Sequence, residues 1–307
     1  MLHYFIINPT AGKHSSSENI ESELKRIFKN RSDHFETYTT TSENDATVQI
    51  RKICEKRKLN QIPNEHIRFY ACGGDGTCFE CVNGVVGQKD VSLAILPVGS
   101  CNDFLKTFPD LDFSDLESLV NGKAEPIDIL KANDSYLLNV CNIGYDAKVN
   151  YDCVMTRSRY KTIKQAYRHA LIKNLMKPLG DKVKVVDENG DVLFEGKSLL
   201  LALGNGQYYG GGYRCTPLAD VQDGLIEFSM IKKVSILTFL RLVGKYKKGE
   251  HITNHEKFKK YALYKQAKQI TITSDDILTI ALDGETLFTK KIVVDIVPKA
   301  INFVFPK

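Results

Sequence analysis

The stretch Ile67-Arg68-Phe69-Tyr70-Ala71-Cys72-Gly73-Gly74-Asp75-Gly76-Thr77 decides the fold, because an apolar run leads directly into a dense glycine cluster. The run Ile67–Cys72 is typical of a buried strand. A helix is predicted to follow the glycine cluster and to continue through Val86. The sequence therefore predicts a strand–turn–helix unit with glycines at the turn.

The glycine turn Gly73–Thr77 also predicts chemistry. Consecutive glycines let the backbone approach a ligand closely and adopt positive φ without a Cβ penalty. A helix that begins there directs free N–H groups and its positive dipole end at an anion, which favours phosphate. Asp75 would repel bare phosphate, so it indicates a metal ion or a hydroxyl group in between. The alternative is a tight turn in which Asp75-Gly76-Thr77 caps the helix; we favour phosphate.

The first half of the chain alternates strand-like and helix-like segments. This alternation predicts an α/β domain, a parallel sheet with helices on both faces. The other predicted strands are Leu2–Ile7, Phe35–Thr41 and Val91–Leu96, and the other predicted helices are Ser17–Asn30 and Asn44–Lys58.

Short strands dominate after Pro126 and predict a mostly antiparallel β-domain. We therefore expect domains 1–126 and 127–297, with 298–307 as a tail that can return to the first. The predicted strands are Ile127–Lys131, Tyr136–Ile143, Val183–Asp187, Ser198–Leu203, Leu225–Ile231, Gln269–Ser274, Leu278–Leu282 and Lys291–Val297. The predicted helices are Tyr160–Lys177 and Val234–Tyr246.

Length and composition agree with two domains. The chain has 307 residues, 43% hydrophobic and 26% charged, which excludes a disordered chain, a collagen and a disulfide-stapled miniprotein. The net charge of +5 favours a phosphate-bearing partner without requiring nucleic acid. Because the sequence shows neither a signal peptide nor an apolar run of about 20 residues, we expect a cytoplasmic protein. The eight cysteines, including the C-x-x-C of Cys78 and Cys81, are predicted to be reduced and buried.

Two further loops follow predicted strands. They are Asn8–Lys13, after the first strand, and Pro97–Phe104, after the fourth. In an open α/β sheet, ligands bind at the carboxyl ends of the strands. Each loop taken singly could be an ordinary turn, but three such loops at one edge favour a binding site.

The motifs together resemble the diacylglycerol kinase catalytic family, which includes soluble bacterial lipid kinases. In the first half the resemblance rests on Asn8-Pro9-x-x-Gly12-Lys13, Gly73–Thr77 and Pro97-x-Gly99-Ser100-x-Asn102-Asp103-Phe104. In the second half it rests on Asn142-Ile143-Gly144-Tyr145-Asp146, Gly204-Asn205-Gly206 with Gly210-Gly211-Gly212, Pro217-x-Ala219 with Asp223-Gly224-Leu225, and Asp283-Gly284-Glu285. The resemblance thus covers nearly the whole chain.

The resemblance implies an ATP-binding α/β domain, a C-terminal β-sandwich and an active site in the cleft between them. Glu285 matches the catalytic base, and Asp75 and Asp103 would hold Mg²⁺ or water against the triphosphate and orient that base. Nucleotide contacts fall on Asn8, Thr40, Gly73, Gly74, Asp75, Gly76, Thr77 and Ser100. A Mg²⁺ site falls on Asp220, Asp223 and Leu225, the last through its backbone carbonyl.

Two positions, Ser100 and Phe79, depart from the family pattern, and Glu285 has a second interpretation. Ser100 replaces a threonine, which keeps the hydroxyl. Phe79 stands where an asparagine is common, which weakens the inference of full activity, although it could simply pack inward. Glu285 could also be a solvated turn carboxylate, because Asp283-Gly284 is good turn chemistry.

Basic residues are concentrated in two stretches of the second half. Tyr151–Lys184 interleaves nine Lys and Arg residues with apolar residues at helical spacing, and a second basic stretch runs from Arg241 to Lys265. Such a helix suits an anionic membrane surface, although a solvated helix face is an equal alternative for either stretch alone. Nucleic acid is not expected as a partner, because no nucleic-acid-binding motif accompanies the patches. A homodimer is possible.

The sequence therefore predicts an ATP- and Mg²⁺-dependent lipid kinase that acts at the membrane surface on diacylglycerol or a related lipid. The alternatives are an NAD kinase-like or other small-molecule kinase with the same Gly-Gly-Asp-Gly-Thr turn, and a catalytically silent nucleotide- or lipid-binding homologue. A hydride-transferring Rossmann enzyme is disfavoured, because Asn8–Lys13 stands where its G-x-G-x-x-G should follow the first strand.

Overall fold

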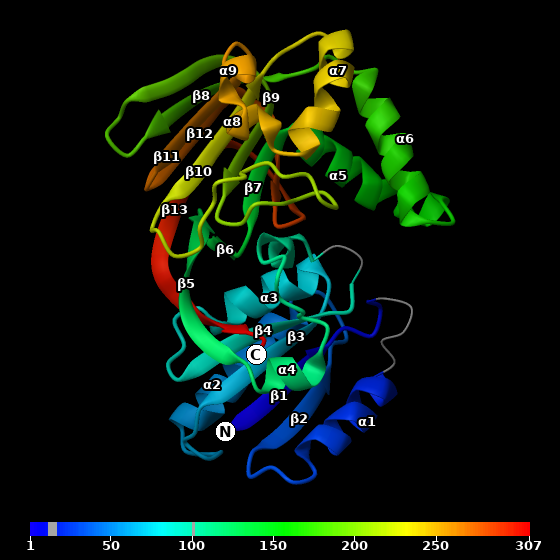
Figure 1. The fold of residues 1–307 in the computed structure, drawn as a ribbon, viewed down its shortest axis with the longest axis vertical. Helices are drawn as coiled ribbons and strands as arrows, with labels where there is room; N and C mark the ends of the chain where they lie inside the picture. The colour runs from blue at the N-terminus through cyan, green and yellow to red at the C-terminus, as the bar shows by residue number, and fades with distance from the viewer. Residues whose placement is uncertain (12–16, 100–101) are drawn as a thin grey trace. The chain divides into compact units, whose positions relative to one another are not determined.

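The chain folds into two compact units (Figure 1). The computed structural model describes residues 1–11, 17–99 and 102–307, without the side chains of residues 17, 18, 255 and 257. Unit 1 comprises Met1–Ile129 and Pro298–Lys307, and unit 2 comprises Leu130–Val297. The boundary expected after Pro126 lies three residues before this division, and the C-terminal tail belongs to unit 1. No described helix combines the length and the apolar character needed to cross a bilayer.

Unit 1 is built on a parallel sheet whose strand order is β13-β4-β3-β1-β2. Every residue of β1 and β3 is buried, as expected for strands covered on both faces. The strands are β1 (Leu2–Ile7), β2 (His34–Thr39), β3 (Ile67–Gly73), β4 (Val91–Pro97) and the end of β13 (Glu285–Phe305).

Helices cover both faces of this sheet, as the sequence predicts. Right-handed crossovers place α1 on one face and α2 and α3 on the other. On the α2–α3 face the helices touch closely, because a Cβ added at Gly84 would lie 2.9 Å from Cβ of Ile50. On the α1 face, Arg31 Nη1 donates to the Asn121 side chain at 2.6 Å, just after α4. The helices are α1 (Ser17–Phe28), α2 (Asp45–Lys58), α3 (Asp75–Val85), the 3₁₀ turn η1 (Asp103–Thr107) and α4 (Leu116–Val120).

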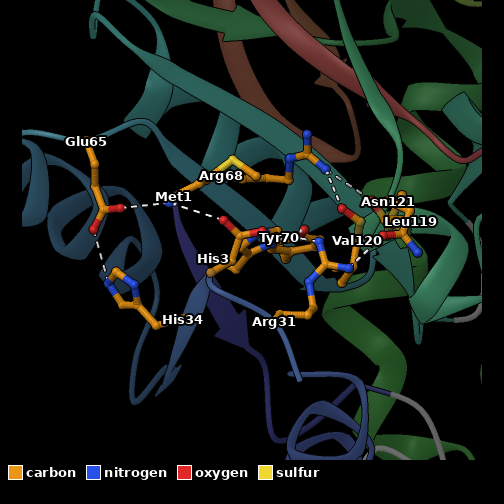
Figure 2. A network of polar contacts seen from close by, with 11 residues as sticks. Met1, His3, Arg31, His34, Glu65, Arg68, Tyr70, Leu119, Val120 and Asn121 are labelled. Atoms are coloured by element: carbon orange, nitrogen blue, oxygen red, sulfur yellow. Dashed lines mark hydrogen bonds and ion pairs between the residues drawn. The ribbon is translucent and has the colours of Figure 1, made fainter. Parts of the chain in front are cut away.

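A buried polar network stabilises the α1 face of unit 1 (Figure 2). His3 is fully buried, with Nδ1 2.7 Å from the Tyr70 hydroxyl. Arg68 donates to the Val120 carbonyl at 2.8 Å, which ties β3 to α4. Burial, aided by the Arg68 charge, lowers the pKa of His3 to about 3, so the ring is neutral at pH 7.

Unit 2 is an antiparallel sheet in the order β11-β10-β9-β7-β12-β13, with β8 paired to β9 and β12. Helices α5, α6 and α7 pack on a common hydrophobic cluster that includes Val140, Leu199 and Phe239. The strands are β5 (Lys123–Ala132), which begins in unit 1, β6 (Ser135–Leu137), β7 (Val140–Gly144), β8 (Asp181–Asp187), β9 (Val192–Gly204), β10 (Ile226–Lys232), β11 (Ala262–Ala267) and β12 (Gln269–Leu282). The helices are α5 (Tyr145–Thr156), the turn η2 (Arg157–Arg159), α6 (Ile163–Leu175), α7 (Ile236–Lys247), α8 (Glu250–Thr253) and α9 (His255–Phe258).

The strand predictions for unit 2 needed three corrections. Tyr136–Ile143 is two strands, β6 and β7, because Leu138 and Asn139 donate their amides to the Asp283 carboxylate. The two strands predicted within 269–282 form one strand, β12, with a register shift between Thr273 and Leu278. Strand β11 and the helices α5, α8 and α9 were not predicted. The prediction of buried cysteines is confirmed for the seven that the structure describes, including Cys78 and Cys81 on α3.

Acidification is expected to destabilise the fold through His251, which is fully buried in unit 2. Its Nε2 lies 3.1 Å from Ser229 Oγ and 3.0 Å from the Cys215 carbonyl, and burial lowers its pKa to about 4. The unfolded chain, with a His pKa of about 6.5, binds the proton first as the pH falls. The stabilisation is therefore complete above pH 6.5 and is lost progressively toward pH 4, by about 3 kcal/mol.

Urea unfolding at pH 7 and pH 4.5 measures this loss. His251→Gln keeps a hydrogen-bonding side chain but cannot titrate, so its free energy of unfolding should fall less than that of the wild type. His34→Gln, at a half-exposed histidine, is the control and should behave like the wild type. Equal pH dependence of His251→Gln and the wild type would contradict the prediction.

Candidate active site

Loops from four neighbouring strands meet at the carboxyl edge of the unit 1 sheet. The Asn8 amide donates to the Cys72 carbonyl at 3.0 Å, and the Thr40 amide donates to the Ile7 carbonyl at 2.9 Å. The Gly99 amide donates to the Gly73 carbonyl at 3.1 Å. The loops that follow β1, β2, β3 and β4 are therefore hydrogen-bonded neighbours at the edge where α/β sheets bind ligands.

Glycine allows two of these loops to touch. A Cβ added at Gly99 would lie 2.5 Å from Cα of Gly74, and one added at Gly73 would lie 2.2 Å from Oγ1 of Thr77. Neither position can hold a side chain without moving its neighbours. Helix α3 begins directly after Gly74, which offers no side-chain cap. Its first N–H groups are therefore free of a cap from the residue at the N-cap position, as in helix N-termini that bind anions.

Asn8 joins the first loop to α3. Its Nδ2 donates to Thr77 Oγ1 at 3.1 Å, while its Oδ1 accepts from the Thr10 amide at 3.0 Å and hydroxyl at 2.8 Å. The structure thus brings Asn8, Thr40 and the Gly73–Thr77 turn together. The prediction for Ser100 lies outside the described residues.

Asp75 and Asp103 are also neighbours. The Asp103 amide donates to Asp75 Oδ1 at 3.3 Å, and the Asp103 residue is only 4% exposed. Asn102, in the left-handed region with φ of 49°, sets the turn that starts η1. Lys106 Nζ forms an ion pair with Asp103 Oδ1, a partner that the sequence reasoning missed. Its only sequence signal was the i,i+3 spacing from Asp103.

The residues after the glycine turn have structural contacts. Glu80 Oε1 accepts from the Asn44 amide at 2.9 Å, and Oε2 accepts from the Ala46 amide at 3.0 Å. Glu80 therefore satisfies the first amides of α2, a role that the sequence reasoning did not foresee. Phe79 is half-buried, and its carbonyl accepts from Asn83 Nδ2 at 2.8 Å.

Glu285 in unit 2 is exposed at the start of β13, directly after the two-residue turn of Asp283 and Gly284. Both turn residues have positive φ, 48° and 100°, as in the tight turns that join antiparallel strands. The turn is fixed on both sides. Asp283 accepts from the Val140 amide at 2.7 Å in addition to the two amides named above, and Asn150 Nδ2 donates to the Gly284 carbonyl at 2.7 Å. A rigid turn therefore presents the Glu285 carboxylate.

The predicted metal ligands lie on the exposed segment before β10. Asp220 Oδ1 accepts from the Gln222 amide at 3.0 Å, and Asp223 Oδ1 accepts from the Leu225 amide at 2.9 Å. Two carboxylates and a backbone carbonyl are the hard oxygen donors that Mg²⁺ prefers, so these residues fit the ion in kind. Among the described residues, however, no group of three or more His, Cys, Asp or Glu side chains is placed to hold a metal.

Two family models match the chain. The diacylglycerol kinase catalytic domain matches residues 3–132, and the YegS C-terminal NAD kinase beta sandwich-like domain matches residues 139–305. The first model ends three residues after the division at Ile129, and the two models bear out the predicted two-domain fold, an α/β domain followed by a β-sandwich.

Curated relatives match over most of the chain. A diacylglycerol kinase of Bacillus subtilis (strain 168) is 28% identical and covers 91% of this chain and 88% of its own. A diacylglycerol kinase of Staphylococcus epidermidis is 29% identical and covers 91% of this chain and 84% of its own. A YegS-like lipid kinase of Shewanella frigidimarina (strain NCIMB 400) is 28% identical and covers 85% of both chains.

Solved structures show the same fold. A crystal structure of a diacylglycerol kinase from Bacillus anthracis str. Sterne has a TM-score of 0.69 at 23% identity, covering 99% of this chain and 96% of its own. Another structure from that organism has a TM-score of 0.74 at 24% identity, covering 99% and 97%. The glycine-rich sheet edge, the two consecutive family models and these relatives lead to one conclusion: the chain belongs to the diacylglycerol kinase catalytic family.

Proposed function

We propose that this protein is an ATP- and Mg²⁺-dependent kinase that phosphorylates the hydroxyl of diacylglycerol or a related lipid at a membrane surface. At family level it is a lipid kinase. The observation that supports the finer proposal is the close approach of Gly99 to Gly74 at the start of α3, where backbone amides would form a cradle for phosphate. The names of the curated relatives support a lipid acceptor.

The nucleotide is assigned to unit 1. The amides of Gly73–Thr77 would bind phosphate, and the Asn8 and Thr40 loops, held to β3 and β1, would bound the site. Phosphoryl transfer depends on positioning and charge neutralisation more than on covalent chemistry. Asp75 and Asp103 would orient the groups around the phosphates, and Lys106 limits the excess negative charge of that carboxylate pair.

Glu285 is assigned as the general base. A lipid alcohol is a poor nucleophile until a base accepts its proton, and an exposed carboxylate on a fixed turn can do so. This role requires the two units to act on one triphosphate. Mg²⁺, when bound, would neutralise phosphate charge; Asp75 and Asp103 are candidates to hold it at the nucleotide, and Asp220, Asp223 and the Leu225 carbonyl to hold it in unit 2.

Transfer of label tests the proposal. The full chain is incubated with γ-labelled ATP, Mg²⁺ and mixed micelles that contain diacylglycerol, and ATP binding is measured separately. Labelled phosphatidic acid is the expected product. Tight ATP binding with no labelled lipid for any acceptor would contradict the proposal and favour a catalytically silent binding protein.

A kinase for NAD is the second candidate, because the matching C-terminal family model is described as NAD kinase beta sandwich-like. The same assay with NAD in place of micelles separates the two. Label in NADP with none in lipid would establish this candidate. Label in lipid alone would remove it.

Phe79→Asn is expected to change kcat and KM for ATP by less than about threefold. The loop contacts in the structure run through Asn8, Thr77 and Gly99, while Phe79 accepts a hydrogen bond from Asn83 with its backbone carbonyl, which asparagine retains. Steady-state kinetics of the two proteins, with circular dichroism to check folding, measure the effect. A gain above tenfold would show that Phe79 impairs the phosphate turn and that the wild type is a weakened enzyme.

A further inference from the structure

The positive charge of the chain is concentrated in two segments. Residues 153–180 and 228–249 together contain 13 Lys and Arg residues and no Asp or Glu. The rest of the chain has 29 basic and 37 acidic residues, a formal charge of −8, although the whole carries +5. The two segments include all of α6 and α7 and the end of α5. Most of their basic residues are exposed, Arg168 on α6 and Arg241 on α7 among them.

The same helices expose large apolar side chains. On α6 and directly after it, Ile172 is 55% exposed and Met176 is 84% exposed. On α7, Leu237 is 77% exposed and Leu240 is 55% exposed. We call these four residues the outer apolar residues. They are not failures of packing, because the opposite faces of both helices, including Ala170 and Phe239, are buried in the hydrophobic cluster of unit 2.

Packing places both helices on one side of the unit 2 sheet (Figure 1). Tyr145 of α5 connects them, since its hydroxyl donates to the Leu171 carbonyl of α6 at 2.8 Å and its ring lies 5.3 Å from that of Phe239 of α7. The outer apolar residues thus extend from two helices that share one packed base. A soluble surface normally scatters single apolar residues, so apolar groups gathered among cations indicate a binding face. Asp152 of α5 neutralises part of this charge, because it pairs with Lys173 at 2.6 Å and with Lys177 at 3.2 Å.

We propose that the outer faces of α6 and α7 form one docking surface for an anionic lipid bilayer, with the outer apolar residues inserted between headgroups and the surrounding Lys and Arg residues bound to lipid phosphates. An anionic bilayer is the occupant that matches both properties, because it offers negative charge at its surface and hydrocarbon just beneath. The inference rests on the proposed function in that the acceptor is a membrane lipid, and it specifies the partner surface.

A tryptophan reporter tests the insertion directly, because the chain contains no Trp. Leu237→Trp in the full chain is titrated with vesicles of phosphatidylcholine and phosphatidylglycerol at 7:3. We expect a blue-shifted emission and quenching by brominated acyl chains, both absent with pure phosphatidylcholine at physiological salt. Val192→Trp is the matched control. Val192 is 52% exposed in the same unit, but it is the first residue of β9 and lies next to Asp191, so the emission of this variant should not change.

Vesicle sedimentation then separates the two contributions. Leu237→Asp with Leu240→Asp should lower the partition coefficient at least tenfold, and Arg241→Glu with Lys245→Glu should lower it by more than about tenfold at low salt. Val192→Asp should leave it unchanged. The proposal is overturned if the Leu237→Trp and Val192→Trp variants respond alike. It is also overturned if the aspartate variants of Leu237 and Leu240 bind vesicles normally but are monomers where the wild type is a dimer, because the face would then be a contact between two copies. These measurements use no ATP, so failure of the kinase proposal would leave them interpretable.

Discussion

Replacing Glu285 with alanine is expected to slow lipid phosphorylation by roughly 10²–10⁴-fold, the contribution of a positioned general base. The affinity for ATP should not change, because Glu285 belongs to unit 2 and the proposed phosphate cradle to unit 1. The turn should stay folded, since Asp283 and Asn150 hold it through contacts that the substitution does not remove. Initial rates with diacylglycerol micelles and calorimetric ATP titration measure the two quantities.

Two variants control this experiment. Glu285→Gln keeps the shape and hydrogen-bonding reach but not the basicity, so its rate should be as low as that of Glu285→Ala. Glu195→Ala removes another exposed carboxylate of unit 2, which pairs at 3.6 Å with Lys184, and should retain full activity. If Glu285→Gln kept wild-type turnover, the side chain would be a positioning group and not the base.

Gly99→Ala should have the second large effect, a loss of about 100-fold in kcat/KM for ATP. Its Cβ would lie 2.5 Å from Cα and 2.9 Å from the amide nitrogen of Gly74, so the backbone of one loop must move away from the other. Displacement of a positioned group by about 1 Å lowers catalytic efficiency by roughly 100-fold. The effect should appear in ATP binding as well as in turnover.

Gly244→Ala is the matched glycine substitution. A Cβ at Gly244 meets nothing within 4 Å, and the residue lies inside α7, so alanine should leave ATP affinity unchanged and stabilise the helix by about 0.5–1 kcal/mol. Thermal unfolding of both variants separates a local effect from a loss of folding. Normal ATP affinity in Gly99→Ala would show that the two loops do not form the phosphate site.

The sequence predicted the parts of this molecule that depend on local rules. Each of the buried strands β1, β3 and β4 is an apolar run, and the loop after it begins near Asn8, Gly73 or Pro97, so their meeting at one edge follows from parallel topology. The glycines at positions 73, 74 and 99 could be selected because close backbone contact excludes other residues. The family resemblance added the roles of the carboxylates, which spacing alone does not assign.

The features that were missed depend on contacts between distant residues. The break between β6 and β7 is caused by Asp283, more than 140 residues along the chain, which no local pattern near Leu138 reveals. Helix α5 was missed because Asp152 lies on its buried side, where Lys173 at 2.6 Å and Asn174 at 2.8 Å compensate it. A buried acid interrupts the apolar periodicity on which helix prediction relies.

The most direct test of the central claim is a crystal structure of the full chain with a non-hydrolysable ATP analogue, Mg²⁺ and a short-chain diacylglycerol. We expect the γ-phosphate at the amides of Gly73–Thr77 and the Glu285 carboxylate within about 2.6–3.2 Å of the acceptor hydroxyl. A complex in which the triphosphate occupies that cradle while the Asp283–Glu285 turn faces away from it, with the lipid bound elsewhere, would contradict the account.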